Sequence, residues 1–170
     1  SCTDSNKCSG HSIEDFDIIS VIGRGYFGKV MLVKKRDSGQ LYALKTIRKS
    51  RLIESGKVET VLNERKILAK SKHPFIAELK FAFQTGSKFY LGLEYISGGE
   101  LFYHMDKCGP LSLYDSKIYI AEIALALEYL HDNGIIYRDL KPENILIDET
   151  GHTKLTDFGL SKETSDSTHS

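Results

Sequence analysis

Segments with the composition of β-strands fill the first part of this chain, and helical segments fill the second part. Residues 16–23, 29–35 and 41–47 are rich in β-branched and apolar side chains, and short turns separate them. A further hairpin is predicted over residues 81–95. Strands joined by short turns pair as an antiparallel sheet. We therefore expect an α+β fold that changes from strands to helices near residues 97–99.

Two segments have the apolar spacing of helices. In residues 57–69 apolar side chains recur every three or four positions. Residues 114–131 are apolar on nearly all sides, and Ser112 with Asp115 forms a capping pattern in front of them. A helix of the second kind packs in the middle of a larger body.

The overall composition excludes several classes of protein. The 170 residues include 23 Lys and Arg and 23 Asp and Glu, so no net field attracts the chain to nucleic acid or to an anionic membrane. No apolar run reaches the roughly 18 to 20 residues of a membrane helix, and the start lacks the apolar core of a secretory signal. Three cysteines without metal-binding spacing are expected to be reduced thiols. The cytosol or the nucleus is the expected location.

Gly23, Gly25 and Gly28 lie in the stretch GRGYFGKV, which nearly satisfies three phosphate-binding patterns. A dinucleotide fold and a P-loop both need a helix directly after the glycines. Here a β-type run follows, and Val30 stands where a P-loop has the hydroxyl that binds magnesium. The interpretation that remains for the glycine stretch is a flexible hairpin that can close over nucleotide phosphates. An ordinary hairpin turn is the alternative.

Lys45 and Glu64 are charges placed among apolar side chains. Strand alternation puts Lys45 on the same face as Ala43 and Ile47. Glu64 lies beside the apolar stripe of the helix that follows. We predict that the two charges pair with each other. The alternative is that both are ordinary charges at the edges of their faces.

Charged and polar side chains are most concentrated in residues 135–147, IIYRDLKPENILI. Asp139, Lys141 and Asn144 stand between two apolar runs, and the proline disfavours a helix there, so a loop held between buried strands is predicted. Asp157 follows shortly, directly before Phe-Gly. Asn144 and Asp157 together offer oxygen ligands of the kind that Mg²⁺ takes. A solvated turn of the same composition is the alternative.

These motifs together resemble the protein kinases. GRGYFGKV, YALK, NERKIL, LEYISGGELF, YRDLKPEN and TDFGLSKE occur in the order of that family over residues 16–163. Tyr137 stands where many kinases have His, and with SGGELF and HPFI it is similar to the AGC group of serine/threonine kinases. AFQTGSKFYL and the segment around YRDLKPENILID look most like its ribosomal-protein-kinase branches, and are similar also to the protein kinase B and C branches.

The resemblance implies a kinase-like α+β fold. An antiparallel small lobe with one main helix would cover residues 16–96, and residues 97–163 would form the hinge and the first part of a mainly helical large lobe. Residues 1–15 are polar and expected to lack fixed structure, and residues 164–170 would begin the activation segment. Because the sequence stops before an A-P-E motif, we expect weak or no transfer by this piece alone and exposed apolar surface on the long helix. A naturally short nucleotide- or regulator-binding module is the alternative, and a plain scaffold is the third possibility.

The resemblance also implies a role for each candidate residue. Catalysis would use Lys45, Glu64, Asp139 and Lys141. Nucleotide binding would use Gly23, Gly25, Gly28, Val30, Ala43, Lys45, Glu94, Ile96 and Glu100. Mg²⁺ would bind Asn144 and Asp157. The implied substrates are ATP and a protein Ser or Thr in a basic context, which Glu100 and Glu143 would attract. An upstream kinase would activate the complete protein.

Overall fold

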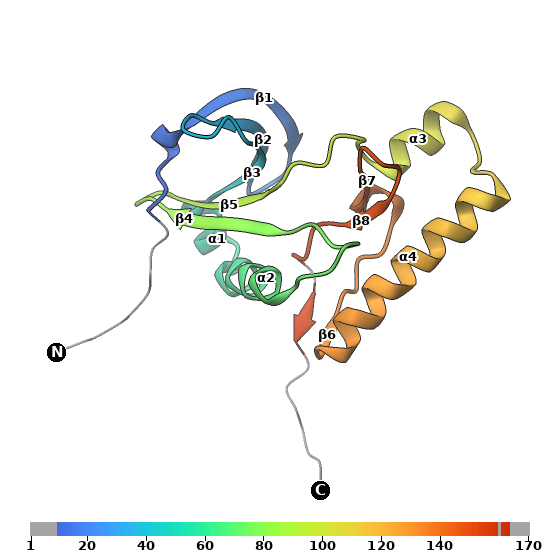
Figure 1. Cartoon of the computed structure of the whole chain (residues 1–170). Coiled ribbons are helices and arrows are strands. Elements are labelled where there is room, and N and C mark those ends of the chain that lie inside the picture. The colour runs from blue at the N-terminus through green and yellow to red at the C-terminus, as the bar shows by residue number, and fades with distance from the viewer. Residues whose placement is uncertain (1–9, 160, 164–170) are drawn as a thin grey trace, which may run out of the picture. The chain divides into compact units, whose positions relative to one another are not determined.

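The computed structural model describes residues 10–159 and 161–163 of the chain (Figure 1). The described residues divide into two compact units. One comprises the residues up to Lys57 together with Leu79–Tyr95, and the other comprises Val58–Glu78 together with the residues from Ile96 onward. The lobe boundaries inferred from the sequence stay a prediction.

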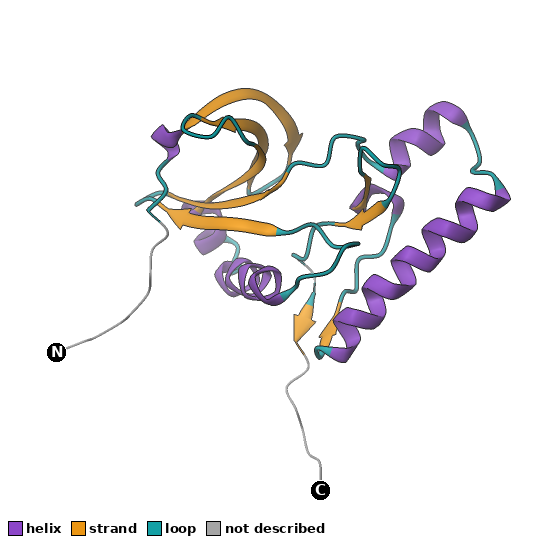
Figure 2. Cartoon of the chain, in the orientation of Figure 1, coloured by secondary structure: helices purple, strands orange, loops and turns teal. Residues whose placement is uncertain are grey.

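The first unit is built on a five-stranded sheet with the strand order β1-β2-β3-β5-β4. Figure 2 shows the strands of the chain in orange. Each neighbouring pair is antiparallel. The short turns predicted this for β1-β2, β2-β3 and β4-β5, but not for the pairing of β3 with β5. The strands are β1 Phe16–Arg24, β2 Gly28–Lys35, β3 Leu41–Arg48, β4 Leu79–Gln84 and β5 Lys88–Glu94.

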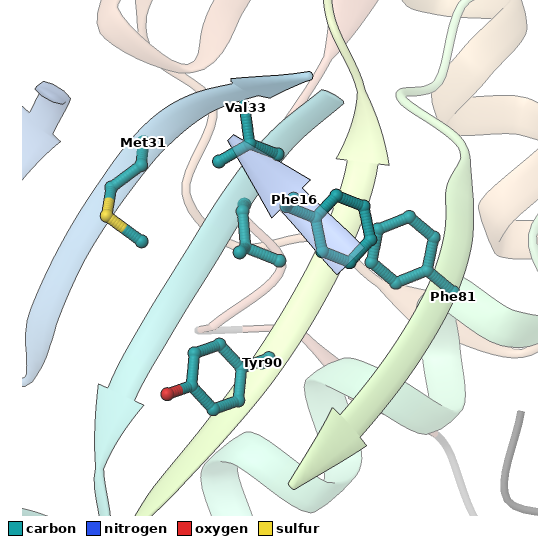
Figure 3. Packing of buried hydrophobic residues seen from close by; sticks show 6 residues of the cluster. Phe16, Met31, Val33, Phe81 and Tyr90 are labelled. Carbon is teal, nitrogen blue, oxygen red and sulfur yellow. The ribbon is translucent and has the colours of Figure 1, made fainter. Parts of the chain in front are cut away.

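Apolar side chains on one face of this sheet form its core. The buried cluster consists of Phe16, Met31, Val33, Leu44, Phe81 and Tyr90 (Figure 3). Phe16 and Phe81 stack with their ring centroids 5.1 Å apart. Burying each such side chain contributes about 1.5–3 kcal/mol. Because Leu44 points into this core, its neighbours Ala43 and Lys45 lie on the opposite face.

A short helix that the sequence analysis did not predict follows β3 directly. This helix, α1 (Lys49–Glu54), has six residues, which is too short for a helical period to show in the sequence. Leu52 is fully buried, and the backbone N–H of Lys49 donates to the carbonyl of Ser87 over 2.9 Å. Tertiary packing, and not intrinsic propensity, therefore holds this helix in place.

The second unit contains the longer helices and two small antiparallel ladders. The helices are α2 Val58–Lys70, α3 Leu101–Cys108 and α4 Leu113–Asp132, and a 3-10 turn, η2, covers Pro142–Asn144. The ladders pair β7 Ile145–Ile147 with β8 Thr153–Leu155 and β6 Ile135–Ile136 with β9 Lys162–Glu163. Only α3 among these helices lacked a prediction.

Helix α4 begins where the capping pattern placed its start. The hydroxyl of Ser112 accepts the backbone N–H of Asp115 at 3.0 Å. Ala126 and Leu130 are fully buried, but several large apolar side chains of this helix are exposed, as expected. They are Leu113, Tyr114, Ile120 and Leu125. In the part of the chain that the structure describes, no helix has the length and apolarity needed to span a bilayer.

The two ends of the chain are described only in part. Residues 1–15 are expected to lack fixed structure, yet Ile13–Asp15 form a 3-10 helix in which Ser12 and Asp15 cap each other. Two of the three cysteines, Cys2 and Cys8, lie outside the described residues, and Cys108 is an exposed free thiol. The predicted start of the activation segment, residues 164–170, also lies outside the described residues.

Candidate active site

The structure places the predicted site residues in both compact units. The sheet unit carries Gly23, Gly25, Gly28, Val30, Ala43, Lys45 and Glu94. The helical unit carries Glu64, Ile96, Glu100, Asp139, Lys141, Asn144 and Asp157. Lys45 belongs to the sheet unit and Glu64 to the helical unit, and their pairing stays a prediction.

In the sheet unit, three candidate residues share one face. Lys45 lies opposite Val30 on the neighbouring strand, and Ala43 lies opposite Leu93 on the other side. Val30, Ala43 and Lys45 all point away from the core because Met31 and Leu44 point into it. Val30 and Ala43 form a small apolar surface, and Lys45 adds one amine beside it. Such a surface can bind a flat ring that carries a phosphate chain. Glu94 is the last residue of strand β5.

Gly25 lies in the turn between β1 and β2, Gly23 near the end of β1, and Gly28 at the start of β2. The backbone N–H of Gly25 donates to the carbonyl of Gly28 over 2.9 Å, which closes the turn. A Cβ atom on Gly28 would lie 1.7 Å from the carbonyl oxygen of Thr46, whereas one on Gly25 would meet nothing within 4 Å. Glycine is therefore required at position 28, because the backbone of β3 lies too close for a side chain. At position 25 a side chain would meet no neighbouring atom.

Gly28→Ala is expected to destabilise the chain by about 1–3 kcal/mol, because the added methyl overlaps the backbone of β3. Urea denaturation followed by circular dichroism measures this loss. Gly25→Ala serves as the matched control and should stay within about 0.5 kcal/mol of the wild type. Equal stability of the two variants would contradict the close packing at Gly28.

In the helical unit, Asp139 is the centre of a polar cluster. Asn144 donates through Nδ2 to the Asp139 carboxylate over 2.8 Å and to the Asp139 backbone carbonyl over 3.0 Å. The Lys141 ammonium lies 3.3 Å from the other carboxylate oxygen. Pro142 begins the 3-10 turn that folds Asn144 back toward Asp139. The predicted loop thus brings these polar residues together.

The β7–β8 hairpin brings Asp157 next to this cluster. Asn144 directly precedes β7, and Asp157 follows two residues after the end of β8. The backbone N–H of Thr156 donates to the Asn144 carbonyl over 3.0 Å. A Cβ atom on Gly159 would lie 3.3 Å from Asp157 Oδ1 and 4.0 Å from Glu64 Oε2. The carboxylates of Glu64 and Asp157 therefore lie at the same glycine.

The backbone at this site is held in an uncommon conformation. Among the described residues, the non-glycine positions with positive φ are Arg138 at 62° and Asp157 at 59°. Such conformations persist where the surrounding structure enforces them, and they cluster at functional sites. Fully buried Phe158 supplies this constraint next to Asp157, since its ring packs edge-on against Tyr137 with the centroids 5.2 Å apart.

Tyr137 is an uncharged residue that supports the segment leading into Asp157. Its hydroxyl donates to the Thr156 carbonyl over 2.5 Å. Burial raises the pKa of the Tyr137 hydroxyl far above its usual value, and the nearby carboxylates of Asp157 and Asp139 raise that pKa further. The hydroxyl therefore stays protonated and keeps donating to the segment that leads into Asp157.

Glu122 anchors the hairpin to helix α4, and the sequence analysis missed it. Its carboxylate accepts the Thr153 N–H at 2.7 Å and the Thr153 hydroxyl at 2.8 Å, and it contacts Nδ1 of His152 at 2.5 Å. Glu122 is buried on the same face of α4 as Ala126 and Leu130. The available signal was the spacing of Glu122, Ala126 and Leu130 at intervals of four residues, which puts the acid on the apolar face of the helix.

Raising the pH from 6 to 8 is expected to weaken the anchor between His152 and Glu122. The hydrogen bond with Glu122, and then its charge, raise the pKa of His152 above 6.5, and Asp148 raises it further. A raised histidine pKa adds stability that is complete below about pH 6.5 and is lost as the pH rises through the folded-state pKa. Urea denaturation at both pH values should show a larger drop for the wild type than for His152→Gln. Equal drops would contradict the anchor.

Comparison with known proteins gives the family. The protein kinase domain family matches residues 16–170. The serine/threonine-protein kinase gad8 of Schizosaccharomyces pombe is 50% identical over 157 residues, which cover 92% of this chain and 28% of the relative. The serine/threonine-protein kinase YPK2/YKR2 of Saccharomyces cerevisiae is 54% identical over 151 residues, with 89% and 22% covered. The ribosomal protein S6 kinase alpha-6 of Mus musculus is 54% identical over 154 residues, with 89% and 20% covered.

The match confirms the family inferred from the motifs. The chain spans between 20% and 28% of the length of these three relatives. The antiparallel five-stranded sheet and the helices that follow it have the architecture of the N-terminal lobe and part of the C-terminal lobe of a kinase domain. The chain belongs to the protein kinase family, and within it to the AGC group of serine/threonine kinases.

Proposed function

We propose that the complete protein transfers the γ-phosphate of ATP to Ser or Thr hydroxyls of protein substrates. One observation carries the proposal. Lys141 and Asn144 both contact the Asp139 carboxylate, while the β7–β8 hairpin puts Asp157 beside Asn144. An amine, an amide and two carboxylates held together in this way can handle a hydroxyl proton and the charge of a phosphate group.

Asp139 and Lys141 are proposed to act on the reacting groups. The Asp139 carboxylate accepts the proton of the substrate hydroxyl, and Asn144 holds that carboxylate in place through its 2.8 Å hydrogen bond. The Lys141 ammonium, 3.3 Å from the same carboxylate, is exposed and can turn to neutralise the phosphoryl group in transfer. Positioning and charge stabilisation are the main sources of catalysis in this reaction class.

Asn144 and Asp157 fit the proposed Mg²⁺ site. The amide nitrogen of Asn144 donates to Asp139, so its Oδ1 atom is the one that can serve as a metal ligand. Asp157 provides a carboxylate nearby, because it directly follows Thr156, whose backbone N–H is hydrogen-bonded to the Asn144 carbonyl. Mg²⁺ is usually bound by one or two carboxylates together with phosphate oxygens. When bound, the ion supplies positive charge to the phosphate oxygens.

The proposed nucleotide contacts use the sheet face and the segment after β5. Val30 and Ala43 pack on the adenine, the backbone of Glu94 and Ile96 bonds its edge, and Glu100 reaches the ribose. Lys45, oriented by Glu64, holds the phosphates under the loop that carries Gly23, Gly25 and Gly28. The shared face of Val30, Ala43 and Lys45 supports this assignment.

The proposed protein substrate carries basic residues near its Ser or Thr. Glu100 and Glu143 are exposed acids within the helical unit, and exposed carboxylates attract Lys and Arg of a peptide. We also propose an upstream activating kinase and a cytosolic or nuclear location for the complete protein.

Calorimetric titration of the chain with ATP tests the nucleotide site. Binding is expected with Mg²⁺ present, and it should weaken when EDTA removes the metal. Asn144→Ala should reduce the effect of Mg²⁺ on affinity, whereas Asn133→Ala, at the C-terminal cap of α4, should leave that effect unchanged. Absence of ATP binding, or binding indifferent to Mg²⁺, would contradict the proposal.

A further inference from the structure

Helix α1 contacts the tip of the glycine loop, the turn formed by Gly25, Tyr26, Phe27 and Gly28. The guanidinium of Arg51 donates to the backbone carbonyl of Tyr26 over 2.8 Å. The same group lies over the Tyr26 ring, 5.3 Å from its centroid. Arg51 is half-buried. One side chain thus holds both the backbone and the ring of a single loop residue.

The second aromatic residue of the loop is held from the same side. The Lys57 ammonium lies over the Phe27 ring at 5.5 Å, and the backbone N–H of Arg48 donates to the Phe27 carbonyl over 2.9 Å. The rings of Tyr26 and Phe27 pack edge-on with their centroids 5.0 Å apart. Both carbonyls at the tip therefore have a donor that comes from the end of β3 or from α1.

The support for these contacts is itself firmly packed. Leu52 is fully buried, and its carbonyl accepts the backbone N–H of Lys57 over 2.9 Å. Helix α1 continues directly from β3, the strand that carries Lys45. A glycine-containing loop loses much conformational entropy when it is ordered. Contacts made before a ligand arrives reduce that cost at the moment of binding.

We propose that Arg51 is a positioning residue that holds the glycine loop in the shape that receives the phosphates of the nucleotide. The proposal rests on the proposed function, because it takes the loop to be the phosphate-binding element. Arg51 acts through the Tyr26 carbonyl and ring, and the loop backbone contacts the ligand. Its effect is therefore confined to ligands that carry phosphates.

The test compares ATP with adenosine. Calorimetry is run on the chain with Arg51→Met, which keeps the packed stem of the side chain and removes the guanidinium. Affinity for ATP with Mg²⁺ should fall about tenfold, while affinity for adenosine should stay within about twofold. Arg51→Lys, which keeps a cation near the Tyr26 ring, should recover part of the loss.

Arg48→Ala is the matched control for loss of a positive charge. Arg48 enters the contact through its backbone N–H, which alanine retains, so this variant should bind both ligands like the wild type. Tyr26→Leu removes the ring under Arg51 without changing α1 and should lower ATP affinity to an intermediate value. It provides a second variant should Arg51→Met fail to fold, and wild-type ATP affinity in Tyr26→Leu would then overturn the proposal.

The outcomes separate this inference from the proposed function. A wild-type chain that binds neither ligand overturns both. A wild-type chain that binds ATP, with an Arg51→Met variant that binds ATP equally well, overturns only the role of Arg51. Equal losses for ATP and adenosine also overturn it, because a general structural role would weaken both ligands alike.

Discussion

Asp157→Asn is expected to lower phosphate transfer from ATP by at least about 100- to 1,000-fold, the range typical of losing one charge-stabilising group, without unfolding the protein. Asparagine is among the few residues that accept the positive φ of 59° found at this position. Its side-chain oxygen can still accept the Gly159 N–H, which lies 3.2 Å from Asp157 Oδ1. The substitution therefore removes the charge proposed to hold Mg²⁺ and retains this hydrogen bond.

Steady-state transfer to a basic serine peptide measures the effect on the active protein, and thermal unfolding measures the fold. Asp148→Asn is the matched control, since Asp148 lies on the same hairpin and caps the turn at Thr150 and His152. That variant should retain transfer. If Asp157→Asn transferred phosphate at the wild-type rate, the assignment of Asp157 would be wrong.

The sequence predicted the elements that depend on local patterns. All five strands of the sheet, α2 and α4 lie where alternation or helical spacing placed them. The loop from Asp139 to Asn144 was predicted because it contains a proline and lies between two apolar runs. Its internal contacts were not, since the bonds from Asn144 and Lys141 to Asp139 depend on backbone folding that no spacing encodes.

Features that depend on contacts between distant residues could not be predicted. Glu122 meets Thr153 across 31 positions of sequence, and Arg51 meets Tyr26 across 25. In the sequence both look like ordinary charges, Glu122 within a predicted helix and Arg51 in a segment for which no helix was predicted. The reason for a glycine at position 28 was likewise hidden, because the clash that forbids a side chain comes from the backbone of another strand. The pairing of Lys45 with Glu64 is still a prediction.

Phe158→Ala is expected to destabilise the chain by about 3–5 kcal/mol, the usual cost of truncating a buried aromatic residue. Phe158 is fully buried, and its ring packs on that of Tyr137. Total stabilities of domains are about 5–15 kcal/mol, so this loss removes a large share. Urea denaturation followed by circular dichroism measures it.

Phe158→Leu is the matched control, because leucine keeps much of the buried volume and should cost less than about 1.5 kcal/mol. The pair of variants also separates packing from chemistry at Asp157. If the ring fixes the direction of the adjacent carboxylate, Phe158→Leu should lose more Mg²⁺-dependent ATP affinity than its small loss of stability explains. If Phe158→Ala were as stable as Phe158→Leu, the ring would not be the packed support that its burial indicates, and the positive φ at Asp157 would need another source.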